Sequence, residues 1–459
     1  MTKVTGSVIN IIQVFVCLLL VFSSAGCAPG QAFKFDSDPA LRTLLQKAPD
    51  YPQTSFITMS DLHVYDTSLG TTGAAFEKYL MNDRKLLRES QEILNMAITA
   101  EIELKPGIIL IPGDLTKDGE KSGHEIVAKA LTRLKDAGKK VYVVPGNHDI
   151  NNSHALKYEG SLTTPVPSIT ADEFAQIYAD FGFKESLFRD KGSLSYVAEP
   201  QPGLWLLGLD SCRYKENLAE GEPITDGKFS PETLQWIEEM LGKAASGGKA
   251  VIIMMHHGIM EHYNGQEKNY GEYIVDNYEE IGRMFAAYNA RLVFTGHYHA
   301  QDITEKQYPT SKFLFDIETG SLVTNPLPYR IINIGADQQM TVRTERITST
   351  SSHPQDLPEF ARNYVLEGIA SIATRTIMKY GVSKEESAML AKQVAEAFAA
   401  HYAGDENLKP GTEPIQQWGL SLPGWFVIQF RKDLVYGLWQ DLPPADNAVT
   451  INLKTGSWK

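Results

Sequence analysis

Histidines gather in a few short turns of this sequence, and one such turn lies in the stretch RLVFTGHYHA. There, an apolar run at residues 292–294 ends at Thr295-Gly296, and His297 and His299 follow with one residue between them. Alternate side chains of an extended chain point the same way, so both imidazoles can face one point beyond a strand end. Two neutral imidazoles that face one point can share a metal ion. Taken alone, the motif is equally consistent with a polar strand end that carries two solvated rings.

Four further turns carry the same residue types. Each follows a short apolar run, and their sequences are Asp61-Leu62-His63, Gly113-Asp114, Gly146-Asn147-His148-Asp149 and His256-His257. Ligands of α/β sheets bind in the crevice at the carboxyl ends of the strands, so these side chains are expected to converge on one place. Each turn alone is common. Together, in this order, they form a specific pattern that predicts a metal site.

The elements that must position these turns alternate along the chain. Apolar, strand-like runs lie at residues 56–59, 108–111, 141–144, 204–209, 251–255 and 292–294. Helical patterns lie between them at about residues 84–102 and 124–137, and Thr170 with Glu173 forms a capping box at the start of another helix. Ser230-Pro231 opens a further helix. This alternation predicts an α/β fold with a layered sheet.

The pattern changes after about residue 350. Residues 363–379 have a helical pattern that Gly381 ends, and Ser383 with Glu386 forms a second capping box before a helix that runs to about His401. We therefore expect one domain at residues 51–348 and a mainly helical C-terminal domain at residues 349–459. The sequence leaves open whether this appendage covers the site, adds stability or forms a dimer.

The N-terminal segment predicts export from the cytoplasm. Lys3 is the only charged residue before Lys34, residues 8–22 are mostly apolar, and small residues precede Cys27. This layout resembles a bacterial lipobox, which implies a signal peptide at residues 1–26, a lipid anchor on Cys27 and a tether at residues 27–50. The protein would then be a membrane-anchored lipoprotein of the cell envelope. The alternatives are a simple secretion signal or a transmembrane anchor, although the apolar stretch is short for a membrane span.

The composition narrows the class of partner. A chain of 459 residues favours two or three domains, and 43% hydrophobic with 22% charged residues is typical of globular proteins. The formal net charge of -13 argues against a nucleic acid polymer as the partner. A small phosphate-bearing ligand stays compatible with this charge, because bound cations can invert the local field. The composition does not determine the oligomeric state.

The five turns, in their order over about residues 54–302, resemble the signature of calcineurin-like metallophosphoesterases. The resemblance implies a four-layer α/β/β/α sandwich that holds two adjacent divalent metal ions. Mixed carboxylate, amide and imidazole ligands suit Zn, Mn, Fe, Co or Ni. By the resemblance, one ion would be held by Asp61, His63 and His299 and the other by Asn147, His256 and His297, with Asp114 bridging both.

The activity that the resemblance implies is hydrolysis of a small phosphoester. A bridging hydroxide would attack phosphorus in line, and His148 would assist the leaving group. Many phosphatases of the family place an Asp or Asn three residues after the bridging Asp, but Lys117 stands there in this chain. We therefore expect Asp118 or Asp149 to orient His148. Lys117 is expected to be solvated, with phosphate binding as the alternative, and His257 is a secondary candidate that would brace a metal ligand.

Two other functions fit parts of the sequence. A non-catalytic cell-envelope lipoprotein would bind metal or a phosphorylated ligand, but it would not need His148 beside two open metal positions. A hydrolase of the metallo-β-lactamase type would need a His-x-His-x-Asp-His run, which the sequence lacks. Residues 262–278 form an aromatic loop between two of the turns, and this loop is expected either to line the substrate site or to pack against the helical appendage.

Overall fold

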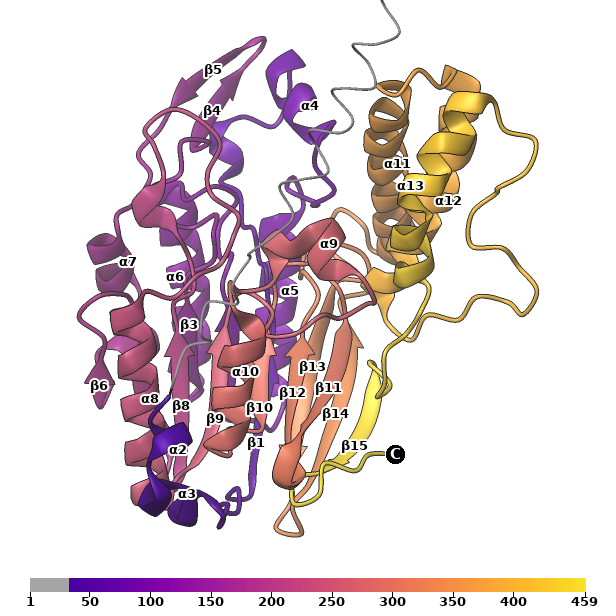
Figure 1. The fold of residues 1–459 in the computed structure, drawn as a ribbon. Coiled ribbons are helices and arrows are strands. Elements are labelled where there is room, and N and C mark those ends of the chain that lie inside the picture. The colour runs from indigo at the N-terminus through magenta and orange to yellow at the C-terminus, as the bar shows by residue number, and fades with distance from the viewer. Residues whose placement is uncertain (1–32) are drawn as a thin grey trace, which may run out of the picture.

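The computed structural model describes residues 33–459 (Figure 1). The predicted signal peptide and Cys27 lie outside the described residues. Two sheets stack face to face, and helices cover the outer face of each sheet. The predicted four-layer sandwich with a helical C-terminal region is therefore confirmed. No helix within residues 33–459 has both the length and the apolar character needed to span a membrane.

The two sheets contain thirteen strands between them. The first sheet, in the order β15-β14-β13-β1-β2-β3, is built from β1 (Thr54–Thr58), β2 (Ile108–Pro112), β3 (Lys140–Val144), β13 (Pro328–Ile334), β14 (Gln339–Arg346) and β15 (Ala448–Asn452). The second, in the order β11-β12-β10-β9-β8-β7-β6, is built from β6 (Phe188–Arg189), β7 (Tyr196–Gln201), β8 (Leu204–Leu209), β9 (Ala250–Met255), β10 (Leu292–Thr295), β11 (Asp302–Tyr308) and β12 (Lys312–Glu318). A separate hairpin consists of β4 (Leu156–Glu159) and β5 (Leu162–Pro165).

Helices complete the outer layers (Figure 1). The first sheet is covered by α5 (Ser90–Glu103) and α6 (Lys121–Asp136), and the second by α8 (Pro231–Ser246) and α10 (Tyr278–Ala287). Shorter helices are α2 (Lys34–Ser37), α3 (Pro39–Leu45), α4 (Ala74–Leu80), α7 (Ala171–Ile177) and α9 (Gln266–Tyr270). The C-terminal helices are α11 (Leu357–Met378), α12 (Lys384–Ala403) and α13 (Leu422–Leu438).

Strand β9 shows how one segment serves two layers. Ile252 and Met254 belong to the core between the sheets, where Phe56 of β1 meets Phe294 of β10 edge to face. The alternate residues of β9, such as Ile253, pack against α8 and α10. A strand buried on both faces needs a continuous apolar run, which explains why the sequence there shows no alternation.

The parallel strands place the five turns at one end of the sandwich. Strands β1, β2 and β3 run parallel in the first sheet, and β9 and β10 run parallel in the second. The turns with the acidic and histidine residues follow these five strands directly. The fold therefore brings the carboxyl ends of strands from both sheets together, as the crevice rule for α/β proteins requires.

Three segments differ from the sequence expectations. Residues 33–50, expected as a tether, contain α2 and α3, whose Phe35 and Leu45 are buried against the second sheet's helices. The helix expected at about 84–102 begins only at Ser90, because Asp83 accepts a hydrogen bond from the Lys85 amide and holds an irregular turn there. The C-terminal part, which was expected to be mainly helical, also contains a strand, β15, which pairs with β14 of the first sheet.

A buried arginine joins both sheets to the C-terminal segment. Arg330 of β13 is fully buried and donates to the carbonyl oxygens of Asp302, Glu318 and Asp446. These three acceptors come from β11, from β12 and from the segment before β15. The helical appendage is thus fastened to the sandwich by polar contacts as well as by its apolar core.

Buried Glu101 on α5 predicts a pH-dependent stability. Neither carboxylate oxygen has a hydrogen-bond partner among the described residues, and burial raises its pKa to about 8 from the ordinary 4.5. The folded protein therefore keeps a proton that the unfolded chain loses above pH 4.5. This contribution to stability is complete below that pH and is lost as pH rises to about 8, and it amounts to a few kcal/mol, roughly.

We expect Glu101→Gln to remove this loss, because a neutral amide has no proton to release. Urea unfolding of both proteins at pH 5 and pH 8 measures the effect. The free energy of unfolding should fall more between these pH values for the wild type than for the variant. An equal fall in both proteins would show that Glu101 is not the group responsible.

Candidate metal centre

Asp114 lies between two groups of histidines at the strand ends. Its Oδ2 atom is 3.5 Å from Nε2 of His63 and 3.4 Å from Nε2 of His256. His63 follows β1 and His256 follows β9, so the two rings come from different sheets. One carboxylate oxygen therefore faces two separate groups of ligand atoms, which is the geometry of a bridging ligand.

The first group contains Asp61, His63 and His299 around Asp114. Oδ1 of Asp61 is 3.4 Å from Nε2 of His299, and Nε2 of His63 is 3.1 Å from that same His299 nitrogen. One potential ligand atom from each of the four residues lies within 4.8 Å of the others. Two ring nitrogens and two carboxylates that converge in this way fit a divalent cation.

The second group contains His256, His297 and Asn147 around Asp114. Nδ1 of His256 lies 2.8 Å from the carbonyl oxygen of Pro112, to which it donates a hydrogen bond. The lone pair of this ring is then on Nε2, which is 3.1 Å from Oδ1 of Asn147. A carbonyl that fixes the tautomer of a histidine in this way is typical of metal ligands. Nδ1 of His297 is likewise left free, because Nε2 lies 3.3 Å from the Glu272 carbonyl.

Five of the seven predicted ligands have left-handed backbone conformations. The φ angles are 51° at Asp61, 37° at His63, 50° at Asp114, 78° at His297 and 71° at His299. Such angles are uncommon outside glycine and cost about 1–3 kcal/mol each. The fold retains them because each turn must bend sharply to aim its side chain at the common point.

Glycines let these turns approach one another. A Cβ atom at Gly296 would overlap the side chains of Ser60 and Asp61, and one at Gly146 would overlap Asp114. Only glycine fits at either position without displacing a predicted ligand. The Gly-His and Gly-Asn pairs in the sequence therefore have a steric cause.

Burial and nearby charges give Asp114 and His63 the ionisation states that metal ligands need. Burial would raise the pKa of Asp114, but nearby His256, His148 and His63 hold it well below its usual range. Burial, reinforced by Lys85, lowers the pKa of His63 well below its usual range, so this ring is neutral. Burial would also lower the pKa of His256, but Asp114 raises it to about 9, and a bound cation would compete with that proton.

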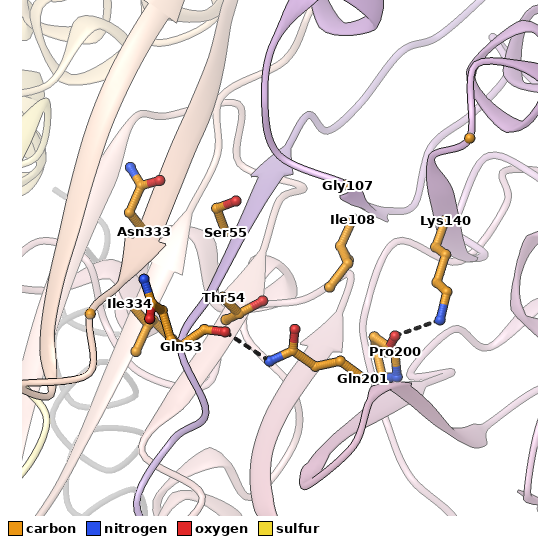
Figure 2. A pocket seen from close by; sticks show the side chains of 12 residues that line it. Gln53, Thr54, Ser55, Gly107, Ile108, Lys140, Pro200, Gln201, Asn333 and Ile334 are labelled. Carbon is orange, nitrogen blue, oxygen red and sulfur yellow. Dashed lines mark hydrogen bonds between the residues drawn. The ribbon is translucent and has the colours of Figure 1, made fainter.

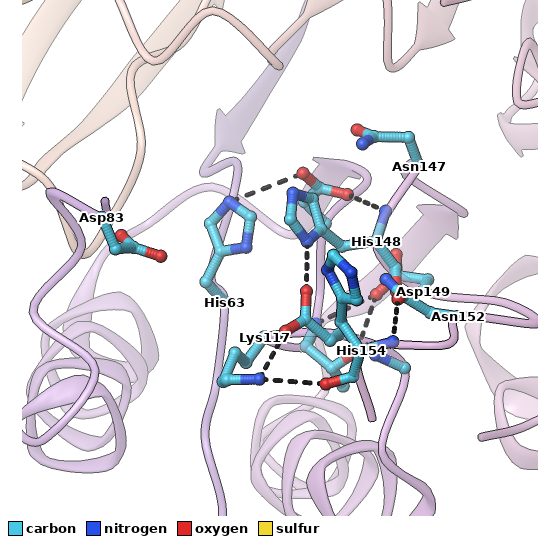
Figure 3. A network of polar contacts seen from close by, with 12 residues as sticks. His63, Asp83, Lys117, Asn147, His148, Asp149, Asn152 and His154 are labelled. Atoms are coloured by element: carbon cyan, nitrogen blue, oxygen red, sulfur yellow. Dashed lines mark hydrogen bonds and ion pairs between the residues drawn. The ribbon is translucent and has the colours of Figure 1, made fainter. Parts of the chain in front are cut away.

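His148 lines the cavity beside the two groups. Its ring lies next to that of His63 (Figure 3). Its Nδ1 lies 2.8 Å from Oδ1 of Asp118, and its side chain is 27% exposed. Burial and Lys85 would lower the pKa of His148, but Asp114 and Asp118 outweigh them and raise it. Asp118 is therefore the residue that orients His148, one of the two expected for this role.

Lys117 does not have the environment expected from the sequence. It is fully buried rather than solvated, and it is absent from the lining of the cavity. Its ammonium group forms an ion pair with Asp118, contacts Glu120 at 3.1 Å and lies 4.3 Å from the centre of the Tyr79 ring. Two acids close in sequence, Asp118 and Glu120, compensate the charge of the buried lysine. Lys117 therefore positions Asp118 instead of binding phosphate.

The remaining secondary candidates brace the turns. The Asp149 carboxylate accepts hydrogen bonds from the backbone amides of Gly146, Leu115 and Thr116, so it closes the turn that carries His148. His257 places Nδ1 2.7 Å from the Ser211 hydroxyl and Nε2 2.8 Å from a backbone carbonyl. Both ring nitrogens of His257 are thus engaged away from the centre.

The centre opens into a cavity of about 490 Å³. Its wall includes Arg84, Lys85 and His154, which the sequence reasoning did not single out. The neighbouring cations Arg84 and Lys85 are a signal for an anion-binding wall, but the sequence pattern predicted that they belong to a helix. Tyr273 of the aromatic loop also lines the cavity, whereas Tyr263 packs with the C-terminal helices, so both expectations for this loop hold for different residues.

A cavity of about 610 Å³ lies at the opposite end of the sandwich, where β1, β2 and β3 begin (Figure 2). Among the described residues, its one ionisable lining residue is Lys140, whose ammonium group donates to the carbonyl oxygen of Pro200 at 2.6 Å. No acid or histidine from residues 33–459 lines it, so despite its size these residues give it no side chains suited to acid–base or metal chemistry.

Comparison with known proteins assigns the family. The family model described as calcineurin-like phosphoesterase matches residues 54–301, and no curated protein sequence matches the chain. A dimetal phosphatase from Danio rerio is 14% identical, with 64% of this chain and 97% of that chain covered and a TM-score of 0.46. A purple acid phosphatase from yellow lupin (Lupinus luteus) is 11% identical, with 68% and 53% covered and a TM-score of 0.39. A 5′-nucleotidase precursor from Thermus thermophilus is 10% identical, with 72% and 60% covered and a TM-score of 0.34.

The match to the family model carries the assignment, because it includes more than half of the chain and all five turns. The structural neighbours are too distant to add to it. The chain therefore belongs to the calcineurin-like phosphoesterases, a family of hydrolases that use two divalent metal ions.

Proposed function

We propose that the protein hydrolyses small phosphoesters at a dinuclear centre in which Asp114 bridges the two ions. The ligands would be Asp61, His63 and His299 for one ion and Asn147, His256 and His297 for the other. The observation that supports this proposal most directly is the Asp114 carboxylate, which faces one histidine of each group at 3.5 and 3.4 Å.

The bound ions and the protein would have separate tasks. Two divalent cations, when bound, activate a water molecule as the nucleophile and neutralise charge on the phosphate oxygens. The protein fixes the seven ligands, five of them in strained backbone conformations, before substrate arrives, so little reorganisation remains for the reaction. Arg84 adds positive charge to the wall of the cavity, which favours entry of an anionic phosphoester, whereas Lys85 is paired with Asp83 at 3.3 Å.

His148 would act as the general acid. Its Nδ1 is occupied by Asp118, which leaves Nε2 directed to the cavity. When the ester bond breaks, Nε2 of the imidazolium would donate its proton to the leaving oxygen, and Asp118 would stabilise the cationic ring beforehand. Lys117 and Tyr79 hold Asp118 in place for this task.

The alternative of a non-catalytic, metal-binding lipoprotein gains less support. The seven ligands are sufficient to bind two ions. The pair formed by His148 and Asp118 lies beside them, is partly exposed to the cavity and is aligned for proton transfer. A hydrolase explains this pair, and a storage or binding protein does not need it.

Hydrolysis of two probes tests the proposal. The Mn- or Zn-loaded protein is given a chromogenic phosphate monoester and the matching diester, with Asp114→Ala as the control. A preference for the diester would make the protein a phosphodiesterase, and a preference for the monoester would make it a phosphatase. Turnover that is equal in the wild type and the Asp114→Ala protein would refute the proposal.

We also propose that the protein is exported and anchored by a lipid on Cys27. The support is the sequence pattern alone, namely an apolar segment that ends in small residues before this cysteine. We expect Cys27→Ala to move the protein from the membrane fraction to the soluble fraction of its native host. A wild-type protein that is already soluble would contradict the anchor.

A further inference from the structure

A third cavity adjoins the metal centre and separates it from the C-terminal helices. It has a volume of about 430 Å³. Arg84 and Tyr273 line both this cavity and the cavity of the metal centre, so the two spaces share a boundary. A ligand with its phosphate at the metal centre can therefore extend into the space between the sandwich and the helices.

The boundary is cationic and aromatic. Nε of Arg84 donates to the hydroxyl oxygen of Tyr402 on α12 at 2.9 Å. Within residues 33–459, Asp83 attracts this guanidinium but no carboxylate forms an ion pair with it, so its remaining N–H groups are available to a phosphate oxygen. The Tyr273 ring lies 4.5 Å from the ring of His297, a predicted metal ligand. Arg84 would hold the non-reacting phosphate oxygens, and the aromatic rings would flank the chain beyond them.

The wall beyond this boundary is mostly apolar. On α11 it is formed by Ile369, Ile372, Ala373 and Ile377, which recur at helical spacing. Two turns of α13 and Val394 and Phe398 of α12 continue it, and its polar groups include Arg431, Asn269, Thr376 and several tyrosine hydroxyls. The mainly apolar part of the wall suits hydrocarbon, and each methylene group buried there would strengthen binding by about fourfold.

The opposite face of α13 exposes large apolar side chains. Leu422, Trp425, Phe426 and Phe430 share one side of the helix by their spacing, and Leu422 and Phe430 are 70% and 72% exposed. Lys432 lies beside Trp425 by the same spacing, whereas Arg431 lies on the other side of the helix and lines the apolar cavity. Exposed Trp and Phe beside a basic residue are typical of segments that lie in the surface of a lipid layer. Helix α13 therefore lies between this exposed face and the apolar cavity.

We propose that the substrate is an amphiphilic phosphoester from a lipid surface. Its phosphate would lie at the metal centre, Arg84 would hold its outer oxygens, and its hydrocarbon tail would fill the cavity lined by α11 and α13. The exposed face of α13 would rest on the lipid layer that supplies the substrate. This inference rests on the proposed function, because it names the substrate class of the same site.

A chain-length series tests the apolar cavity. The full-length protein is given alkyl phosphates and alkyl 4-nitrophenyl phosphates with methyl, butyl or octyl chains, all below their critical micelle concentrations. We expect kcat/KM to rise by at least about 30-fold from methyl to octyl. Ala373→Phe fills the cavity and should reduce this ratio to less than about fivefold. Ala448→Phe, an equal change at an exposed position of β15, should keep the wild-type ratio.

The outcomes separate this inference from the proposed function. Asp114-dependent hydrolysis without any gain from methyl to octyl would leave the phosphoesterase intact and overturn the lipid substrate. If no ester is hydrolysed, calorimetric binding of octyl phosphonate and methyl phosphonate decides the matter. Octyl phosphonate should then bind at least about 30-fold more tightly, and Ala373→Phe should abolish the difference. Equal binding of both phosphonates would overturn the inference.

The lipid surface needs its own measurement. A long-chain phosphoester is presented in phosphatidylglycerol–phosphatidylcholine vesicles, and its hydrolysis is divided by that of the monomeric octyl ester. We expect Phe430→Ser to lower this ratio by about tenfold, because the exposed face would lose a side chain that enters the lipid layer. An unchanged ratio would refute docking on lipid. A dimer in sedimentation that Phe430→Ser dissociates would assign the face to a second copy instead.

Discussion

Replacement of Asp114 by Ala is expected to lower kcat/KM for phosphoester hydrolysis by at least about 10³-fold. The side chain is almost completely buried, and its Oδ2 faces His63 and His256 from the two ligand groups. Its loss would remove a ligand of both ions at once. Loss of an outer-sphere partner of a metal ligand already costs about 10–100-fold, so loss of a shared ligand should cost more.

The measurement is steady-state hydrolysis by equal amounts of folded protein. Asp172→Ala is the matched control, because Asp172 is an exposed carboxylate on α7 away from the centre. The control should keep wild-type activity, and circular dichroism should show that both variants are folded. A folded Asp114→Ala protein within tenfold of the wild-type rate would rule out a bridging role for Asp114.

Replacement of His148 by Gln is expected to slow hydrolysis of alkyl phosphoesters by about 10²–10⁴-fold. An alkoxide is a poor leaving group, so its departure depends on the proton that His148 donates. A nitrophenolate leaves without that proton, and the same variant should lose less than about tenfold with nitrophenyl esters. The dependence on the leaving group is the signature of a general acid.

The control for this variant is His353→Gln, because His353 stacks on Phe360 away from the centre. It should not change either rate. A His148→Gln protein that loses activity equally with alkyl and nitrophenyl esters would show that His148 only braces its turn. A protein without loss on either ester would exclude His148 from the reaction.

The sequence was sufficient to predict the architecture and the convergence of the candidate ligands. Apolar runs that end in Asp, Asn or His mark the parallel strands, and parallel strands in one layer end on the same side. His256 lies next to Asn147, and His63 next to His299, and in each pair the two residues follow strands of different sheets. The sequence alone does not show which strands of the two sheets face each other. There the resemblance to a known family supplied the grouping.

Features that depend on contacts between residues far apart in the sequence could not be predicted from the sequence pattern. Lys117 looked like a solvated residue, since nothing in its local sequence shows that three tyrosine rings surround its ammonium group. Arg84 lay in a helical pattern that Asp83 interrupts through one local hydrogen bond. Strand β15 pairs with β14, about a hundred residues earlier, and its five residues have too little pattern to predict this. Long-range packing decided each case.

Metal titration tests the central claim most directly. The protein is stripped with a chelator, and its phosphoester hydrolysis is measured as Mn or Zn is added back in steps. We expect no activity without metal and a rise that saturates at two equivalents per chain, because six ligands form two groups around the seventh, Asp114. Full activity in the metal-free protein, or saturation at one equivalent, would contradict a dinuclear centre.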